Sequence, residues 1–181
     1  MCGAPLENGH AHVVDREQHR LLCSCRPCYL LFTHSGAGGG RFRSVAERVI
    51  PLPNEELQAV PWEALEIPVG VAFFLRDSAR DKVQAFYPSP AGATEAGLAL
   101  EIWNDIVTAS PTIAAMEPDT EALLVWRRQS VMEAWIVAVD ACYALVGRIR
   151  RQWTGFAGGP EAWQEIGSFF AELRTRERSC A

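Results

Sequence analysis

The sequence is poor in positive charge. Its 17 lysines and arginines are outnumbered by 22 aspartates and glutamates, which gives a formal net charge of −5. A surface that binds nucleic acid normally needs a basic face to neutralise the phosphates. The composition therefore argues against nucleic acid as a partner.

Long apolar runs are also missing. No uninterrupted apolar stretch approaches the roughly 20 residues that a membrane-spanning helix needs. Residues 1–12 lack the basic and then apolar pattern of a signal peptide. We therefore expect a protein without a membrane span that stays in the cytoplasm. In that reducing compartment, the six cysteines are expected to be thiols or metal ligands instead of disulfides.

The chain does have the composition of an ordinary globular protein. With 181 residues, of which 49% are hydrophobic and 22% charged, it fits one domain, or one domain with a small appendage. A glycine-rich stretch at residues 35–40 is typical of a linker or long turn. We therefore expect a Cys/His-rich metal-binding subdomain over residues 1–35 and a larger body over residues 41–181.

The order of the expected elements predicts an α+β fold. In the first segment, residues 12–15 and 20–23 are short apolar stretches that can pair as a hairpin. In the body, residues 42–52 are expected to be extended, and Asp140 is expected to be the N-cap of a helix. Further strands are expected at residues 69–75, 83–87, 122–126 and 134–139, and helices at residues 60–65, 98–109, 140–153 and 160–173. Strand pairs followed by helices indicate a mainly antiparallel sheet with C-terminal helices, here with a small zinc-ribbon-like N-terminal subdomain.

The clearest chemical signal is the group of cysteines and histidines near the N-terminus. Cys25 and Cys28 form a C-x2-C element, a spacing at which one tight turn can aim two thiolates at a single tetrahedral metal ion. Cys2 is followed by a glycine, as in the second half of such a turn. The candidate metal ligands are Cys2, Cys23, Cys25, Cys28 and His12, with His10 close by in sequence. These are more candidates than a four-ligand site needs, and the sequence does not show which four of them would bind the metal.

Zinc is the metal that a thiolate-rich tetrahedral site favours, with iron or an iron–sulfur cluster as the alternative. A site closed by four protein ligands would be structural, whereas a catalytic site needs an open position. The competing interpretation is a set of reduced thiols that bind no metal. A thiol enzyme is a third interpretation, in which Cys25 or Cys28 has a low pKa beside a histidine. Cys142 lies on the apolar stripe of an expected helix and is interpreted as a core residue.

Several motifs resemble those of an uncharacterised bacterial family. They are Cys2-Gly3-Ala4-Pro5, His10-x-His12-Val13-Val14-Asp15, Leu22-Cys23-x-Cys25-Arg26-x-Cys28, Ile67-Pro68-Val69-Gly70, the stretch from Tyr87 to Glu95, Asp140-Ala141-Cys142-Tyr143, Arg150-x-x-Trp153 and Gly155-Phe156-x-Gly158-Gly159. The family that they resemble is found mainly in actinobacteria, where its members tend to be encoded beside high-affinity, oxygen-tolerant [NiFe]-hydrogenases. The resemblance covers nearly the whole chain.

The resemblance implies an accessory role in the maturation or assembly of a hydrogenase, or in electron transfer to it. The expected partner is therefore a [NiFe]-hydrogenase subunit or maturation factor, and the oligomeric state stays open. The family pattern has a cysteine three positions before the one that matches Cys2. We accordingly expect the fourth ligand either upstream of Met1 or at Cys23 or a histidine. A non-enzymatic accessory protein with a structural zinc site is the first hypothesis, and a rubredoxin-like iron redox carrier is the alternative.

Overall fold

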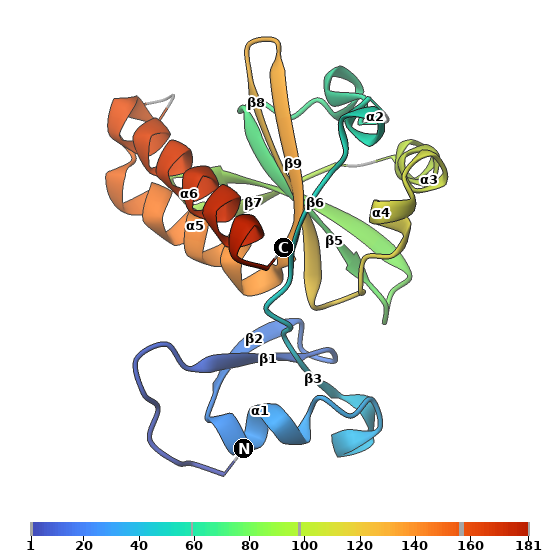
Figure 1. Cartoon of the computed structure of the whole chain (residues 1–181), viewed down its shortest axis with the longest axis vertical. Coiled ribbons are helices and arrows are strands. Elements are labelled where there is room, and N and C mark those ends of the chain that lie inside the picture. Colours follow the sequence, from blue (N-terminus) through green and yellow to red (C-terminus); the bar gives the residue numbers. More distant parts are fainter. Residues whose placement is uncertain (1, 59, 98, 156–157, 181) are drawn as a thin grey trace.

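The computed structural model describes residues 2–58, 60–97, 99–155 and 158–180. It contains two antiparallel sheets, which lie one above the other along the long axis of the molecule, with the last two helices beside the larger sheet (Figure 1). The predicted α+β class with C-terminal helices is therefore confirmed. Within the described residues, no helix is both long and apolar enough to cross a membrane.

The smaller sheet is formed by the N-terminal part of the chain. The predicted hairpin is present as β1 (Ala11–Asp15) and β2 (Arg20–Ser24), and β3 (Phe42–Ser44) pairs with the other edge of β1. Helix α1 (Arg26–Leu31) contacts β1. The division of the chain between residues 35 and 41 stays a prediction, and β3, which follows it, belongs to the smaller sheet.

The glycine-rich stretch forms a compact turn. Residues Ala37–Gly40 make a short 3-10 helix, η1, in which Gly38 and Gly39 have left-handed backbone angles, with φ of 59° and 68°. A Cβ atom at Gly38 would lie 3.2 Å from Phe42 and 3.3 Å from Phe32. Glycine is needed at position 38 because the backbone is left-handed there and two aromatic rings pack closely against it.

The larger sheet has six strands in the order β4-β9-β8-β5-β6-β7, all antiparallel to their neighbours. The strands are β4 (Val49–Pro51), β5 (Val71–Asp77), β6 (Lys82–Ser89), β7 (Gly92–Ala96), β8 (Glu121–Arg128) and β9 (Val131–Ala138). The four predicted body strands correspond to β5, β6, β8 and β9. β7 was not predicted, because the prolines and glycine at residues 88–92 were interpreted as the end of the preceding strand.

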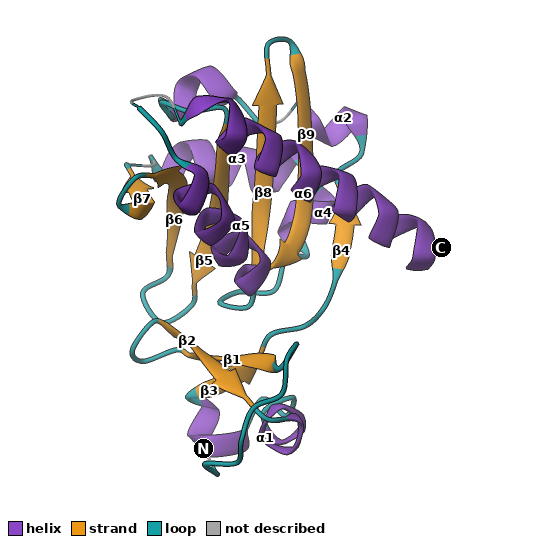
Figure 2. Ribbon diagram, turned by 90° about the vertical axis from the view of Figure 1, so that its left-hand side faces the viewer, coloured by secondary structure: helices purple, strands orange, loops and turns teal. Residues whose placement is uncertain are grey.

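Helices cover both faces of the larger sheet, which is seen nearly edge-on in Figure 1. One face packs against α5 (Val139–Gln152) and α6 (Gly159–Cys180), which cross in front of the strands in Figure 2. The other face is covered by α2 (Asn54–Leu57), η2 (Trp62–Leu65), α3 (Leu100–Ala109) and α4 (Pro111–Ala114). Alternate residues of β8 enter the two cores: Leu124 faces α5 and α6, and Leu123 faces the opposite layer. Residues 122–126 of β8 are buried on both faces of the sheet, which explains why this part of the strand is continuously apolar.

Two of the predicted helix starts differ from the structure. Helix α3 begins at Leu100, and Leu98, where the helix was predicted to begin, lies outside the described residues. Helix α5 begins at Val139 with Ala138 as its N-cap, so the prediction of Asp140 as N-cap is wrong. The carboxylate of Asp140 instead contacts His12 of the smaller sheet. A tertiary partner has therefore replaced the local capping interaction that the sequence suggested.

A small hydrogen-bond network joins α2 to α4. Ser110, the N-cap of α4, donates its hydroxyl to Glu56, and Thr112 donates its backbone N–H at 3.1 Å and its hydroxyl at 2.9 Å to the same carboxylate. The hydrogen bond from Ser110, together with those from Thr112, outweighs the effect of partial burial and holds the pKa of Glu56 below its ordinary value. The ionised form of Glu56 is therefore favoured in the folded protein.

This network predicts a pH-dependent contribution to stability. Because the pKa of Glu56 is lower in the folded than in the unfolded chain, the contribution is complete above the unfolded pKa of about 4.3 and is lost as pH falls through the folded value. Urea unfolding of the wild type and of Glu56→Gln between neutral and acid pH measures it. The variant is expected to be less stable at neutral pH, with the difference shrinking in acid. A difference that stays constant with pH would contradict the prediction.

Candidate metal centre

The C-x2-C element lies where β2 ends and α1 begins. Cys25 is the N-cap of α1 and has an extended backbone, with ψ of 159°, and a proline occupies the first turn after it. Its carbonyl accepts the backbone N–H of Tyr29 at 3.0 Å, which closes the first helical turn. Because residues three apart lie on the same side of a helix, the side chains of Cys25 and Cys28 face the same way. Cys28 is buried against Val13 and Phe32.

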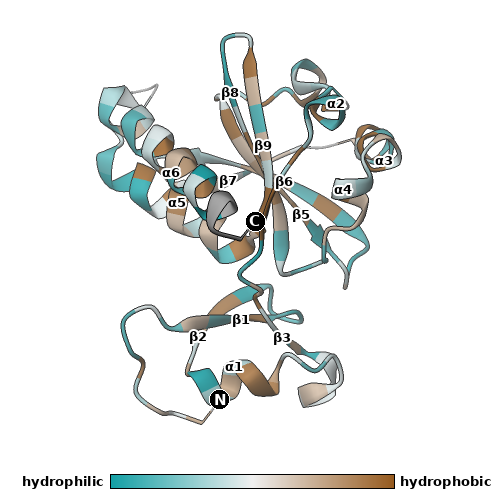
Figure 3. Ribbon diagram, in the orientation of Figure 1, coloured by the Kyte–Doolittle hydropathy of each residue, from teal (hydrophilic) through white to brown (hydrophobic). Residues whose placement is uncertain are grey.

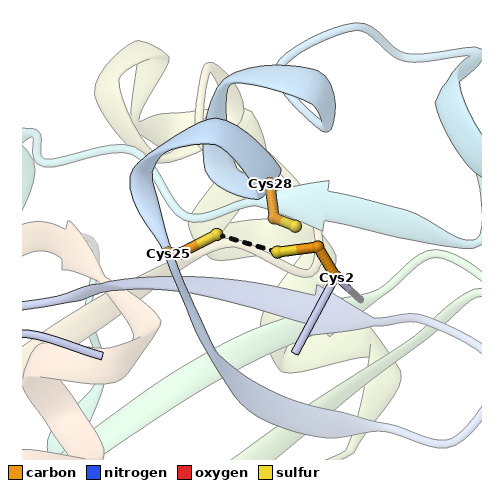
Figure 4. Close-up of side chains that lie close together, drawn as sticks. All are labelled: Cys2, Cys25 and Cys28. Carbon is orange, nitrogen blue, oxygen red and sulfur yellow. Dashed lines mark hydrogen bonds between the residues drawn. The ribbon is translucent and has the colours of Figure 1, made fainter. Parts of the chain in front are cut away.

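Cys2 approaches this turn from the N-terminal segment. Its Sγ atom lies 3.4 Å from that of Cys25, and the thiols of Cys2, Cys25 and Cys28 point toward one another (Figure 4). The three sulfur atoms all lie within 4.8 Å of one another. The three residues are free cysteines, and 3.4 Å is far longer than the S–S bond of about 2.05 Å in a disulfide. The structure therefore brings together three thiols from two separate segments.

The spacing of these thiols fits a metal ion. Thiolates about 2.3 Å from a tetrahedral zinc ion lie about 3.8 Å from one another, and the observed sulfur atoms are within an ångström of that arrangement. Cys2, Cys25 and Cys28 could thus hold a metal ion, with each sulfur providing one ligand. When bound, such an ion would cross-link the N-terminal segment to the first turn of α1.

The thiols of the cluster differ in acidity. The backbone N–H of Ala4 and then the thiols of Cys25 and Cys28 lower the pKa of Cys2, because hydrogen bonds to a thiolate favour it. For Cys25, the backbone N–H of Cys28 lowers the pKa of the thiol. The hydrogen bond with the thiol of Cys2, burial, and the hydrogen bond with the thiol of Cys28 together outweigh this effect, so the pKa of Cys25 is raised. A raised pKa does not favour Cys25 as the nucleophile of a thiol enzyme.

The five predicted ligands fall into two groups. Cys2, Cys25 and Cys28 form the cluster just described, whereas Cys23 and His12 lie together with His10 in a second group. Cys23 and His12 are direct partners in the pairing of β1 with β2. Sequence spacing alone placed all five in one set, because it does not show on which face of the hairpin each side chain lies. The sequence signal that links His10 with His12 is their spacing of two residues at the start of the hairpin.

Cys142 belongs to neither group. Cys142 is fully buried in the core between the larger sheet and α5 and α6, where burial and then the charge of Asp140 raise the pKa of its thiol. A thiol in such surroundings packs as a small apolar side chain. Its interpretation as a core residue agrees with this position.

The comparison with protein families identifies the chain at the level of family. The model of a family of unknown function, DUF5947, matches residues 1–177. The chain belongs to this family. The match to DUF5947 includes both sheets and the Cys2, Cys25 and Cys28 cluster, and it agrees with the resemblance to an uncharacterised family. No curated protein and no solved structure matches the chain.

Proposed function

We propose that this protein is a non-enzymatic accessory protein for the maturation or assembly of a [NiFe]-hydrogenase. In this proposal Cys2, Cys25 and Cys28 provide three of the four ligands of a structural zinc ion, and the N-terminal part of the chain binds a hydrogenase subunit or maturation factor in the cytoplasm. The observation that supports it best is the convergence of three free thiols at the start of α1. The choice of partner follows from the resemblance of the motifs to a family encoded beside such hydrogenases.

A structural role for the metal follows from the small size of the core beneath α1. The buried apolar residues there are Val13, Cys28 and Phe32, with Phe42 and two others partly buried against them. A core of that size cannot by itself offset the conformational entropy of ordering the N-terminal segment. Small subdomains of this kind are commonly stabilised by a metal ion. A zinc ion on the three thiols would supply that stability.

Helix α1 also offers a surface for a partner. Leu30 and Leu31 are 51% and 58% exposed, although leucine is usually buried. They follow Cys28 and Tyr29, in the part of α1 that is coloured hydrophobic in Figure 3. A metal bound by Cys25 and Cys28 would hold this helix in place. Adjacent exposed leucines on a fixed helix are suited to the apolar centre of a protein interface.

Copurification tests the proposal. The tagged full-length protein is isolated from cells that produce the hydrogenase, and hydrogenase subunits or maturation factors are expected to be enriched with it. Leu30→Glu/Leu31→Glu should reduce that enrichment at least about tenfold, because it places two charges in the apolar surface. Val131→Glu is the matched control, since Val131 is 55% exposed at the distant β8–β9 turn. Enrichment should be unchanged in this control.

Two results would overturn the proposal. One is a protein that never associates with hydrogenase components while the hydrogenase assembles normally in a deletion strain. The other concerns the metal: a coloured, iron-containing preparation that is reduced and reoxidised reversibly would favour the rubredoxin-like carrier. A colourless protein with stoichiometric zinc is the expected result.

A further inference from the structure

The hairpin of the smaller sheet brings three further metal-binding side chains together. His12 in β1 is the direct partner of Cys23 in β2, and residues paired in this way have side chains on the same face of a sheet. His10 lies immediately before β1, two residues from His12. One ring nitrogen of each histidine and the sulfur of Cys23 lie within 4.8 Å of one another. The two imidazole rings are 5.1 Å apart, edge to face.

This group is separate from the cluster of Cys2, Cys25 and Cys28. Val13 packs against Cys28 and Phe32, so that face of β1 points toward the first cluster. The next residue, Val14, packs against Val139 at the start of α5 and therefore marks the opposite face. His12 shares the face of Val14, because it lies two residues away along the strand. The sheet itself therefore stands between the two groups of potential ligands.

Hydrogen bonds orient both imidazoles for binding a metal. Nδ1 of His10 donates to the carbonyl oxygen of Glu7 at 3.0 Å, and Nδ1 of His12 donates to Oδ2 of Asp140 at 2.8 Å. The direction is fixed, because carbonyl and carboxylate oxygens only accept. A neutral ring that donates through Nδ1 has its lone pair on Nε2. Metal-bound histidines usually show this arrangement, with a carbonyl or carboxylate holding the second nitrogen.

We propose that His10, His12 and Cys23 form a second metal site, separate from the thiol cluster. Two imidazole nitrogens and one thiolate suit a divalent ion of the zinc type and leave a fourth position open for water or another ligand. Asp140 is a positioning residue that holds His12 from helix α5 of the body. Binding of the ion therefore fixes a contact between the smaller sheet and the body. The site does not depend on the proposed hydrogenase partner.

Counting bound ions tests the second site. The full-length protein is stripped of metal, loaded with Co²⁺ under reducing, anaerobic conditions, and analysed for cobalt and for its visible spectrum. His10→Asn/Cys23→Ser is expected to bind one ion fewer per chain than the wild type. The difference spectrum should show a tetrahedral ion with thiolate charge transfer of about one-third the intensity of the cysteine cluster, because only one thiolate is a ligand. His34→Asn, a substitution of an exposed histidine, should bind as many ions as the wild type.

Asp140 gives a second, independent measurement. Asp140→Ala is expected to weaken binding of that one ion about 10- to 100-fold, the usual effect of removing the hydrogen-bond partner of a metal-bound histidine. Affinity at the thiol cluster should be unchanged. Asp140→Asn, whose side-chain oxygen still accepts from Nδ1, should recover part of the lost affinity. A purely structural role of Asp140 would not produce this selective loss and recovery.

The proposal is overturned by either of two outcomes. In one, His10→Asn/Cys23→Ser binds as many ions as the wild type, so that these side chains hold none. In the other, it loses the ion of the thiol cluster as well, and all the ligands then serve one site. Cys23 is exposed and His10 half-buried, so the variant is expected to fold, and its far-ultraviolet circular dichroism confirms this before loading. If the protein does not copurify with a hydrogenase component, the proposed function is contradicted, but the expected number of bound ions stays the same.

Discussion

Cys28→Ser is expected to abolish metal binding at the thiol cluster and to unfold the smaller sheet while the larger sheet stays folded. Cys28 is 8% exposed and belongs both to the cluster and to the small core beneath α1. The substitution removes a thiolate ligand and places a hydroxyl group beside Val13 and Phe32. Structural zinc sites contribute about 10 kcal/mol in small zinc-binding units. That is more than a core of a few buried side chains provides.

Limited proteolysis and metal analysis measure this effect. In the variant, trypsin is expected to cleave rapidly at Arg16, Arg20 and Arg43, which lie in or beside the smaller sheet. The body should survive as a resistant fragment, since its two cores contain neither the cluster nor its supporting residues. Removal of the metal from the wild type by a chelator should give the same pattern of cleavage.

Cys142→Ser is the matched control for this experiment. It also replaces a buried cysteine by serine, but in the core between the larger sheet and α5 and α6. It is expected to lower the free energy of unfolding of the body by about 1–2 kcal/mol through burial of a hydroxyl group and to leave the metal content unchanged. A Cys28→Ser protein that keeps its metal and resists trypsin like the wild type would contradict the prediction.

The strand pairs of the fold could be predicted because their signals are local. β1 with β2, and β8 with β9, are each neighbouring apolar stretches joined by a few polar residues. β7 was missed because Pro88 appeared to end the strand before it. In the structure β5 pairs with β6 only as far as Phe86, so Pro88 lies beyond that ladder and its missing N–H disrupts no bond to β5. Whether a strand can contain a proline at a given position therefore depends on the register of the neighbouring strand, which the sequence does not show.

The candidate ligands could be predicted from their types and spacing, but their grouping could not. Cys23 and Cys25 are two residues apart and would share a face if β2 continued. β2 ends at Ser24, and Cys25 already belongs to the turn into α1. The contact between His12 and Asp140 joins residues 128 positions apart. No local pattern predicts such a contact, because it arises only when the smaller sheet packs on the body.

Arg48→Ala is expected to destabilise the body by about 3 kcal/mol, because it leaves a buried carboxylate without its charged partner. Arg48 lies between β3 and β4, in the segment that joins the two sheets. Its Nε and Nη2 atoms each donate to the carboxylate of Glu121 at 2.7 Å. Glu121 is only 1% exposed, at the start of β8. The pairing also raises the pKa of Arg48, which keeps the guanidinium charged.

The environment of Glu121 explains why the expected loss is large. After removal of the guanidinium, the backbone N–H of Glu117, at 2.8 Å, is the remaining hydrogen-bond donor recorded for this carboxylate in the described part of the chain. One neutral donor does not replace water around a buried charge. Arg48→Lys retains the charge but not the two-pronged geometry, so it should lose less stability than Arg48→Ala.

Urea unfolding of these variants is compared with that of Arg148→Ala. Arg148 forms an ion pair of similar type with Glu172 at 3.0 Å, but both side chains are substantially exposed. Water can solvate the partner that remains, so this control should lose no more than about 1 kcal/mol. Equal losses for Arg48→Ala and Arg148→Ala would mean that Glu121 is solvated in the folded protein. A larger loss for Arg48→Ala would show that the segment joining the sheets is fixed to the body by a buried charge, which also limits how the smaller sheet can move relative to Asp140.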